Sequence, residues 1–220
     1  MNSLVRDHFL RRGLGPEFEM EVDWVRRHLP AGSGCISDVG CGIGALLEVI
    51  GASRAIGVDH SEEGLRSTHT RFPSARVLCA DAQHLPFGDA SLEGLTSQHV
   101  VEHIEAYEAA CREWFRVLEP GGRLLVLTPN GSFCDPQVFD DPTHVRIFDA
   151  ESLSRLLTQT GFEVLDVRTL GLPFFQNYDR IPAGWRLRRF VTGRAQMLSN
   201  VPGWKRKGQT LCCAARRPTG

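Results

Sequence analysis

A glycine-rich turn between an apolar strand and a helix is the feature that most constrains this chain. The turn Asp38-Val39-Gly40-Cys41-Gly42-Ile43-Gly44 follows the apolar residues around Ile36 and leads into Ala45-Leu46-Leu47. Glycines at alternate positions leave one side of the turn without β-carbons. A flat ligand can then lie against the backbone, beside the amide groups that begin a helix. The pattern predicts a strand, a ligand-binding turn and a helix, the opening unit of an α/β fold.

A carboxylate stands at the end of the next predicted strand, Ala55–Asp59. Asp59 follows Gly40 by 19 residues, where a carboxylate can accept hydrogen bonds from both hydroxyls of a ribose. The turn and the acid together predict an adenosine-containing cofactor. Dinucleotide-binding proteins space their glycines as G-x-G-x-x-G to seat a pyrophosphate, whereas this chain has G-x-G-x-G. A dinucleotide is therefore the second interpretation.

A third predicted strand also ends in an acid, at Asp81, and a loop over residues 83–87 follows it. With this segment the chain resembles the class I S-adenosylmethionine-dependent methyltransferases, in particular the broad group that includes the ubiquinone and menaquinone methyltransferases. The resemblance spans residues 34–168 and a closing strand near 210–216, and it implies S-adenosyl-L-methionine as the cofactor. The matching segments, in the family's order, are DVGCGIG (38–44), GVDHS (57–61), CADAQHLPF (79–87), QHVVEHI (98–104) and RVLEPGGRLLVLTPN (116–130).

Predicted strands alternate with helices, which favours a parallel sheet covered on both faces. The resemblance implies an α/β fold of the Rossmann-like, doubly wound type, with a mostly parallel seven-stranded sheet and an antiparallel last strand. A chain of 220 residues, 42% of them hydrophobic, suits one such domain. Helices are predicted over residues 16–29, 61–72, 104–118 and 149–160, and later strands over 123–128, 162–170 and 210–216.

Three parts are expected along the chain. An N-terminal helical segment covers residues 1–33, the cofactor-binding core covers 34–171 and 208–220, and an insertion covers 172–207. The insertion holds eight basic residues against one acid, together with six aromatic residues. It can be a structural flap, with its aromatic rings packed on the sheet, or an acceptor lid that favours an anionic or glycan-like substrate. Contact with a membrane surface or with RNA is a third interpretation.

The composition of the chain indicates a cellular compartment but does not indicate a class of binding partner. A formal net charge of −1 neither favours nor excludes a class of partner. No apolar run approaches the length of about 18 residues that a membrane span needs, and residues 1–12 hold no export signal. Seven cysteines form an odd set without C-x-x-C spacing, and Cys79, Cys212 and Cys213 fall in predicted strands, where buried thiols act as apolar side chains. A reduced, cytoplasmic protein is expected.

The resemblance also implies cofactor contacts residue by residue. Asp59 would hold the ribose hydroxyls, His60 would pack near the adenine, and Asp81 would accept from the adenine amino group. Ser97 and Gln98, at the end of the fourth strand, would lie near the methionine part. The complete expected set is Asp38, Gly40, Cys41, Gly42, Gly44, Asp59, His60, Asp81, Ala82, Ser97 and Gln98.

One departure from the family's pattern and two residue roles leave alternatives open. The family's fourth strand usually opens with an aspartate, but residues 91–94 read Ser-Leu-Glu-Gly here, which leaves the register of that strand open. Asp38 would order the glycine turn, yet both Asp38 and Asp81 can instead serve only as turn or cap residues.

His144 is the first candidate for a catalytic base. It lies in the segment 139–148 (FDDPTHVRIF), after the fifth strand, in a loop at the carboxyl end of the sheet where open α/β folds bind ligands. A histidine near neutral pKa, oriented by Asp140 or Asp141, suits deprotonation of a hydroxyl group. The alternative is that His144 only ties the loop to the next helix. A metal site from these three residues is too sparse to expect, so no metal is predicted.

His99 is the second catalytic candidate, because it follows the fourth strand, where relatives often carry a glutamate. His103 belongs to a Glu-His pair that is common in the family, and a scaffold role is expected for it. His84 is expected at the rim of the cofactor site.

The predicted activity is S-adenosylmethionine-dependent O-methylation of a small-molecule or sugar-like metabolite. One alternative is N- or C-methylation of a small metabolite such as a quinone precursor. Methylation of RNA or protein is disfavoured because no Asn-Pro-Pro-Tyr-type tetrapeptide follows the fourth strand. A non-catalytic scaffold is disfavoured by the intact glycine turn and both acids. DNA is not expected as a partner, and a homodimer is left open.

Overall fold

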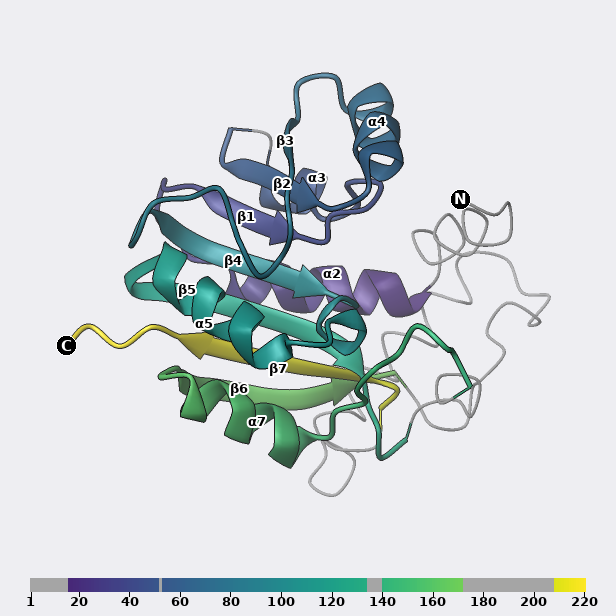
Figure 1. Ribbon diagram of the computed structural model, residues 1–220, viewed down its shortest axis with the longest axis vertical. Helices are drawn as coiled ribbons and strands as arrows, with labels where there is room; N and C mark the ends of the chain where they lie inside the picture. The colour runs from purple at the N-terminus through teal and green to yellow at the C-terminus, as the bar shows by residue number, and fades with distance from the viewer. Residues whose placement is uncertain (1–15, 52, 134–139, 172–207) are drawn as a thin grey trace.

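The computed structural model describes residues 16–51, 53–133, 140–171 and 208–220, which build one seven-stranded sheet with helices on both faces (Figure 1). Its strands are β1 (Ile36–Val39), β2 (Ala55–Asp59), β3 (Arg76–Cys79), β4 (Leu92–Gln98), β5 (Leu118–Pro129), β6 (Glu163–Leu170) and β7 (Thr210–Arg216). Their order is β3-β2-β1-β4-β5-β7-β6. Strands β1 to β5 are parallel, and β7 is antiparallel to β5 and β6. The predicted Rossmann-like sheet is confirmed.

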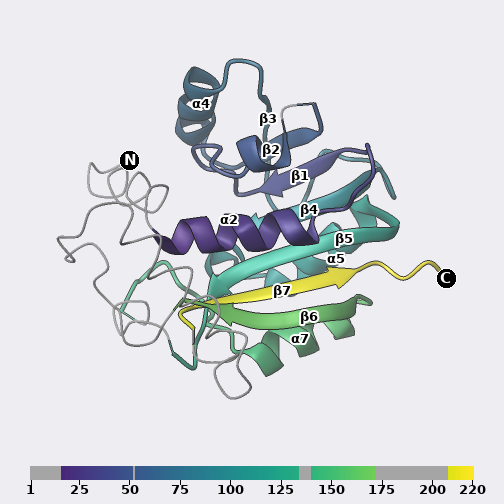
Figure 2. The ribbon, with the colours of Figure 1, turned by 180° about the vertical axis from the view of Figure 1, so that it is seen from behind.

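The helices divide between the two faces. Helix α2 lies on one face, in front of the sheet in Figure 2, whereas α5 and α7 lie on the other face, in front of the sheet in Figure 1. The bounds are α2 (Pro16–His28), α3 (Leu47–Ile50), α4 (Glu62–Arg71), α5 (Tyr107–Val117) and α7 (Ala150–Gln159), with a 3₁₀ helix η1 (Val101–His103).

Residues 124–127 of β5 and 211–215 of β7 are continuous apolar runs because both faces of these strands are covered. In β5, Leu124 and Val126 join the core beneath α5 and α7, whereas Leu125 and Leu127 join the core beneath α2. This alternation follows from the two-residue period of a strand. Trp114 of α5 is the largest fully buried side chain of the first core, and its indole N–H donates to the carbonyl of Ala82.

Two predicted helix starts are confirmed by their caps. Ser61 accepts a hydrogen bond from the backbone N–H of Gly64, and Asp149 accepts one from the N–H of Ser152. The predicted helix over 104–118 begins later, at Tyr107. Ile104 has an extended backbone that separates η1 from α5, so one continuous helix cannot form there.

Cys79 corrects one expectation. Cys212 and Cys213 are fully buried in β7 as predicted, but Cys79 is exposed. It lies in β3, the edge strand, whose side chains are largely uncovered. Strand periodicity alone could not distinguish an edge strand from a central one.

Glu93, the second residue of β4, connects this strand to the segments before β1 and β2. Its carboxylate accepts hydrogen bonds from the backbone N–H of Gly34 at 2.6 Å and from the guanidinium of Arg54 at 3.0 Å. A register shift between Leu92 and Gly94 sets this residue apart from the regular pairing with β5. The fold keeps an acid here, one residue into the strand.

The insertion predicted over 172–207 is attached at a defined place, although its own structure lies outside the described residues. Strand β6 ends at Leu170, which is paired with Thr210 at the start of β7. Thr210 is in turn paired with Pro129, at the carboxyl end of β5. The chain therefore leaves and re-enters the sheet at the edge where the parallel strands end. None of the helices in the described ranges has the length and apolarity of a membrane span.

Candidate functional site

The carboxyl ends of β1, β2 and β4 meet where the strand order reverses. Val39, the last residue of β1, is paired with Val58 on one side and with Ser97 on the other. Asp59 of β2 is paired with Cys79 of β3. Open α/β sheets bind ligands in the crevice at this kind of switch point. Most predicted cofactor residues therefore lie along one edge of the sheet.

The glycine turn is fixed by backbone hydrogen bonds to β2. The N–H groups of Gly40 and Cys41 both donate to the carbonyl of Val58, at 2.7 and 3.0 Å. All three glycines have positive φ, which an L side chain rarely adopts. Gly40 and Gly44 are also needed for close packing, because a β-carbon would come within 2.1 Å of Val100 and 2.7 Å of Thr68, respectively.

Gly42 is different, because a β-carbon there would meet no atom within 4 Å. Its φ of +52° still disfavours a side chain. Its N–H donates to Asp59, and its carbonyl accepts from the hydroxyl of Thr68. The open side of the turn is thus bare backbone, as an adenosyl ligand requires.

Gly42→Ala is expected to weaken S-adenosylmethionine binding at least about tenfold, because the new methyl group projects into the space kept for the ligand. The cost in folding should be limited to backbone strain of about 1–2 kcal/mol. Isothermal titration calorimetry and thermal unfolding measure the two effects. Gly51→Ala is the matched control, since Gly51 also has positive φ and open surroundings but lies after α3, outside the turn. Equal affinities of the two variants would contradict a cofactor role for Gly42.

Asp59 ties the glycine turn to the start of α4. One carboxylate oxygen accepts from the N–H of Gly42 and the other from the N–H of Ser61, both at 2.8 Å. Each carboxylate oxygen has a further lone pair, so the group can still accept from two hydroxyls. His60 is almost fully exposed, with Nδ1 3.6 Å from the Asp59 carboxylate. These positions fit the ribose and adenine roles that the resemblance implies.

Asp38 lies beneath the turn and is fully buried. Burial raises its pKa to about 7; a hydrogen bond from the Thr96 hydroxyl, 2.7 Å long, opposes this rise, and the charge of Asp59 adds to it. The carboxyl group links β1 to β4, so a packing role accompanies any contact with a cofactor. A buried acid with this pKa is half-protonated near neutral pH.

Asp38 should make the fold less stable as pH rises from about 4 to about 7. The unfolded chain releases this proton near its ordinary pKa of 3.8, whereas the folded chain holds it to about 7. The folded state therefore binds more protons in this window, and the free energy of unfolding falls by on the order of 4 kcal/mol. Asp38→Asn keeps the acceptor for Thr96 and should remove this component. Urea unfolding at several pH values measures it, with Asp23→Asn on α2 as the control. If the free energy of unfolding changed with pH in the same way in wild type and Asp38→Asn, this contribution of Asp38 would be refuted.

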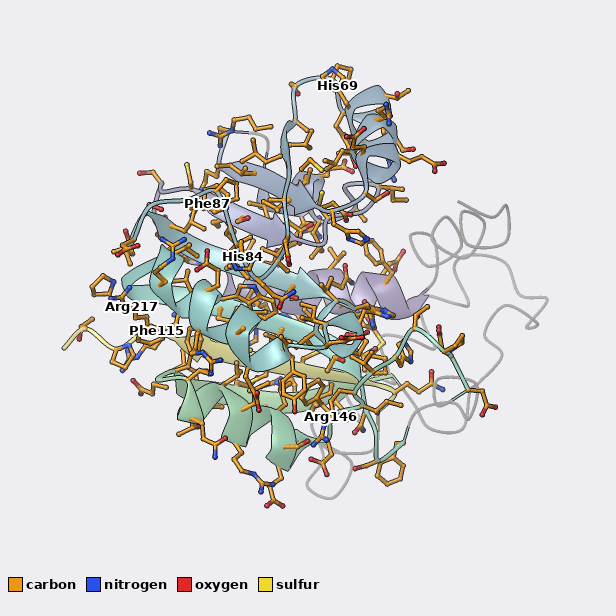
Figure 3. The ribbon with its side chains drawn as sticks, viewed as in Figure 1. His69, His84, Phe87, Phe115, Arg146 and Arg217 are labelled. Carbon is orange, nitrogen blue, oxygen red and sulfur yellow. The ribbon has the colours of Figure 1, made fainter. Side chains whose placement is uncertain are left out.

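The remaining predicted cofactor residues have varied settings. Asp81 accepts from the N–H of Gln83, which lowers the pKa of Asp81 and makes it a turn residue as well as a candidate adenine acceptor. His84, labelled in Figure 3, lies 3.7 Å from the same carboxylate. Ala82 follows in this loop, and its backbone carbonyl accepts a hydrogen bond from the indole N–H of Trp114.

Three others face the protein interior. Cys41 is buried, and burial raises the pKa of its thiol well above the usual range, so it remains neutral. The Ser97 hydroxyl is buried without a hydrogen-bond partner among the described residues. Gln98 donates its side-chain N–H to Glu21 of α2.

His99 is held between two buried carboxylates at the end of β4. Its Nε2 lies 3.3 Å from Glu21, and its Nδ1 lies 3.5 Å from Glu102. Its φ of +55° places the backbone in the left-handed region, where a residue other than glycine is strained. Such strain gathers at functional sites. The neighbouring Val100 packs against Gly40, so this cluster adjoins the glycine turn.

Glu21 is a site residue that the sequence did not reveal. It is buried, and its carboxylate accepts hydrogen bonds from Thr210 of β7 and Gln98 of β4 and lies beside His99. The available signal was a charge on the apolar stripe of α2, at helical spacing from Phe18 and Val25. Helix α2 thereby becomes part of the site.

His144 lies in a second group of ionisable side chains beside the first. Its side chain is 9% exposed, and its Nε2 is 3.9 Å from Asp141. Its ring packs against the ring of His103, with centroids 4.7 Å apart. Asp141 also accepts from the N–H of Thr143. The predicted pairing of His144 with an aspartate is present, but His103 is brought in as well.

Known proteins resemble this chain over the same region. Residues 37–126 match a family model described as a methyltransferase domain. The chain belongs to the class I S-adenosylmethionine-dependent methyltransferases. A probable S-adenosylmethionine-dependent methyltransferase of Mycolicibacterium smegmatis is 36% identical over 62% of this chain and 54% of its own length. An O-methyltransferase of Pyrenophora dematioidea is 30% identical over 67% of this chain and 61% of its own.

The chain therefore spans less than two-thirds of the length of these curated methyltransferases. Among solved structures, a SAM-dependent methyltransferase from Archaeoglobus fulgidus superimposes with a TM-score of 0.68 over 95% of this chain and 99% of that one, at 21% identity. At that identity the likeness concerns the methyltransferase fold. The open face at Gly42 and the acceptor pair of Asp59 fit the family's cofactor.

Proposed function

We propose that this chain transfers a methyl group from S-adenosyl-L-methionine to a hydroxyl oxygen of a small-molecule or sugar-like acceptor. Family membership supports the cofactor and the reaction class. The name of the Pyrenophora dematioidea relative, an O-methyltransferase, supports oxygen as the methylated atom. The observation on which the proposal depends is the histidine–carboxylate cluster beside the glycine turn.

The residues of the glycine turn would bind and orient the cofactor. The cofactor supplies a methyl group already activated on a sulfonium, so alignment and exclusion of water account for most of the catalysis. Gly42 offers bare backbone, and Asp59 offers lone pairs to the ribose. Asp38, at the base of the turn, places a negative charge or a proton beneath the cationic ligand.

A hydroxyl acceptor must also lose its proton, and the cluster after β4 would remove it. His99, Glu102, His103 and His144 gather imidazole and carboxylate groups in one place. Val100 joins this place to the turn, because it packs on Gly40. We assign proton handling to His144 and His99, with Glu21 and Glu102 holding the ring of His99. A neutral amine or a stabilised carbanion would need no strong base, so the cluster favours oxygen.

A methyl-transfer assay tests the proposal. Purified protein is incubated with S-adenosylmethionine labelled in its methyl group and with panels of hydroxyl, amine and carbon acceptors of neutral and anionic character. Label on a hydroxyl oxygen, with stoichiometric S-adenosylhomocysteine, is the expected result. Label found only on nitrogen or carbon would contradict O-methylation and support the N- or C-methylation alternative. Binding of the cofactor without turnover on any panel would favour the scaffold.

A further inference from the structure

Two imidazole rings and a buried carboxylate converge between η1 and the segment before α7. Glu102 and His103 belong to η1, and His144 comes from the segment 140–149. One potential ligand atom from each lies within 4.8 Å of the other two. This is a compact donor set, although His144 follows Glu102 by 42 residues and His103 by 41 in the chain. The sequence-based metal candidates were Asp140, Asp141 and His144, and the observed set shares only His144 with them.

Backbone hydrogen bonds hold the two segments together. The N–H groups of Val145 and Arg146 both donate to the carbonyl of Glu102, at 2.9 and 3.2 Å. His103 adds a side-chain contact, since its Nδ1 lies 3.0 Å from the carbonyl oxygen of Thr143. The donor set is thus held by several independent contacts.

The contact of His103 also determines its tautomer. A carbonyl oxygen can only accept, so Nδ1 must carry the proton and donate it to Thr143. In the neutral ring Nε2 then has a free lone pair. Metal-binding histidines commonly use this arrangement, with one nitrogen donating to a carbonyl while the other binds the cation. His103 is exposed, which leaves coordination positions open to solvent or substrate.

Glu102 is a buried carboxylate whose oxygen lies 3.5 Å from Nδ1 of His99. One of its oxygens accepts from the hydroxyl of Thr128 at 3.0 Å. That contact orients the carboxylate from the side of β5. The carboxylate of Asp141 adds negative charge near His144.

We propose that Glu102, His103 and His144 bind a divalent first-row transition-metal cation. Two imidazoles and one carboxylate form a ligand set for zinc and its neighbours, whereas magnesium and calcium prefer oxygen donors alone. Three protein ligands leave positions for further ligands.

The role of the cation rests on the proposed function. An acceptor hydroxyl bound to it would lose its proton to solvent more readily, and the resulting oxygen anion would take the methyl group from the sulfonium. His144 then acts as a ligand, in place of the general base that the sequence suggested.

Metal titration of tag-free protein tests the site. Zinc binding is measured by calorimetry, and cobalt binding by the visible absorption of an imidazole-ligated ion. One equivalent is expected to bind to wild type. His103→Ala and His144→Ala should each bind at least about tenfold more weakly, the loss that disturbing a metal's surroundings commonly causes. His69→Ala is the matched control, because His69 is exposed on α4, at the opposite end of the molecule from Arg146 (Figure 3).

Further measurements separate folding and activity from binding. Binding of S-adenosylhomocysteine shows that each variant is folded, and Glu102→Gln supplies a third ligand change that keeps the hydrogen-bond acceptor for Thr128. Undiminished metal affinity in all three ligand variants, or no uptake of either cation by wild type, would overturn the proposal. Metal binding without methyl transfer to any acceptor would count against the proposed function alone. Full methyl transfer by metal-free protein that also fails to bind zinc would overturn the metal site alone.

Discussion

Asp59→Ala is expected to lower the affinity for S-adenosylmethionine by about 100-fold or more while the sheet remains folded. Two hydrogen bonds from ribose hydroxyls to a charged acceptor contribute roughly 1.5–3 kcal/mol each. The same substitution also releases the N–H groups of Gly42 and Ser61, so the turn loses its tie to α4. Both effects reduce affinity. Calorimetry with S-adenosylmethionine and with S-adenosylhomocysteine measures the loss.

Two further variants make this result specific. Asp59→Asn keeps one acceptor oxygen and should fall between wild type and alanine. Glu62→Ala removes a neighbouring exposed carboxylate, paired with Arg66 on α4, and should leave affinity unchanged. If Asp59→Ala bound the cofactor as tightly as Glu62→Ala does, the ribose assignment would be wrong.

His144→Ala is expected to reduce kcat by about 100-fold to 10,000-fold, the usual contribution of a group that handles a proton in the transition state. Affinity for the cofactor should stay within a few-fold, because His144 lies beyond the glycine turn, beside Asp141 and His103. Steady-state kinetics on the acceptor identified by the panel, with calorimetry for the cofactor, separate the two quantities. The free-base and metal-ligand roles both predict this loss of turnover.

Chelation distinguishes those two roles. Removal of metal should reduce wild-type turnover to the level of His144→Ala if His144 is a ligand, and should leave it unchanged if His144 is a general base that binds no metal. His69→Ala should behave as wild type throughout. Unchanged turnover in His144→Ala would remove proton handling from this residue and, with it, the main argument for an oxygen acceptor.

The cofactor half of the site could be predicted from the sequence because its signals are local. The glycines at positions 40, 42 and 44 and the acid Asp59 lie at the ends of adjacent strands, and parallel strands bring such ends to one edge. Strand periodicity likewise predicted the buried thiols of β7. It was wrong for Cys79, because the position of β3 at the edge depends on the order of all seven strands.

The histidine–carboxylate cluster after β4, which we propose handles the proton of the acceptor, could not be predicted in the same way. Glu21, His99 and Thr210 meet only after α2, β4 and β7 have packed together. His103 and His144 meet because the carbonyl of Glu102 accepts two N–H groups from the segment 140–149. Neither meeting leaves a periodic pattern in the chain. A lone charge on an apolar helix stripe, as at Glu21, was the one hint available.

The pairing of Leu170 with Thr210 and of Thr210 with Pro129 has an evolutionary consequence. Everything between β6 and β7 is anchored at two neighbouring points on the rim, so descendants can exchange that stretch wholesale without altering the register of any strand. The length and sequence of that stretch can therefore change over evolution without displacing the glycine turn at the ends of β1 and β2.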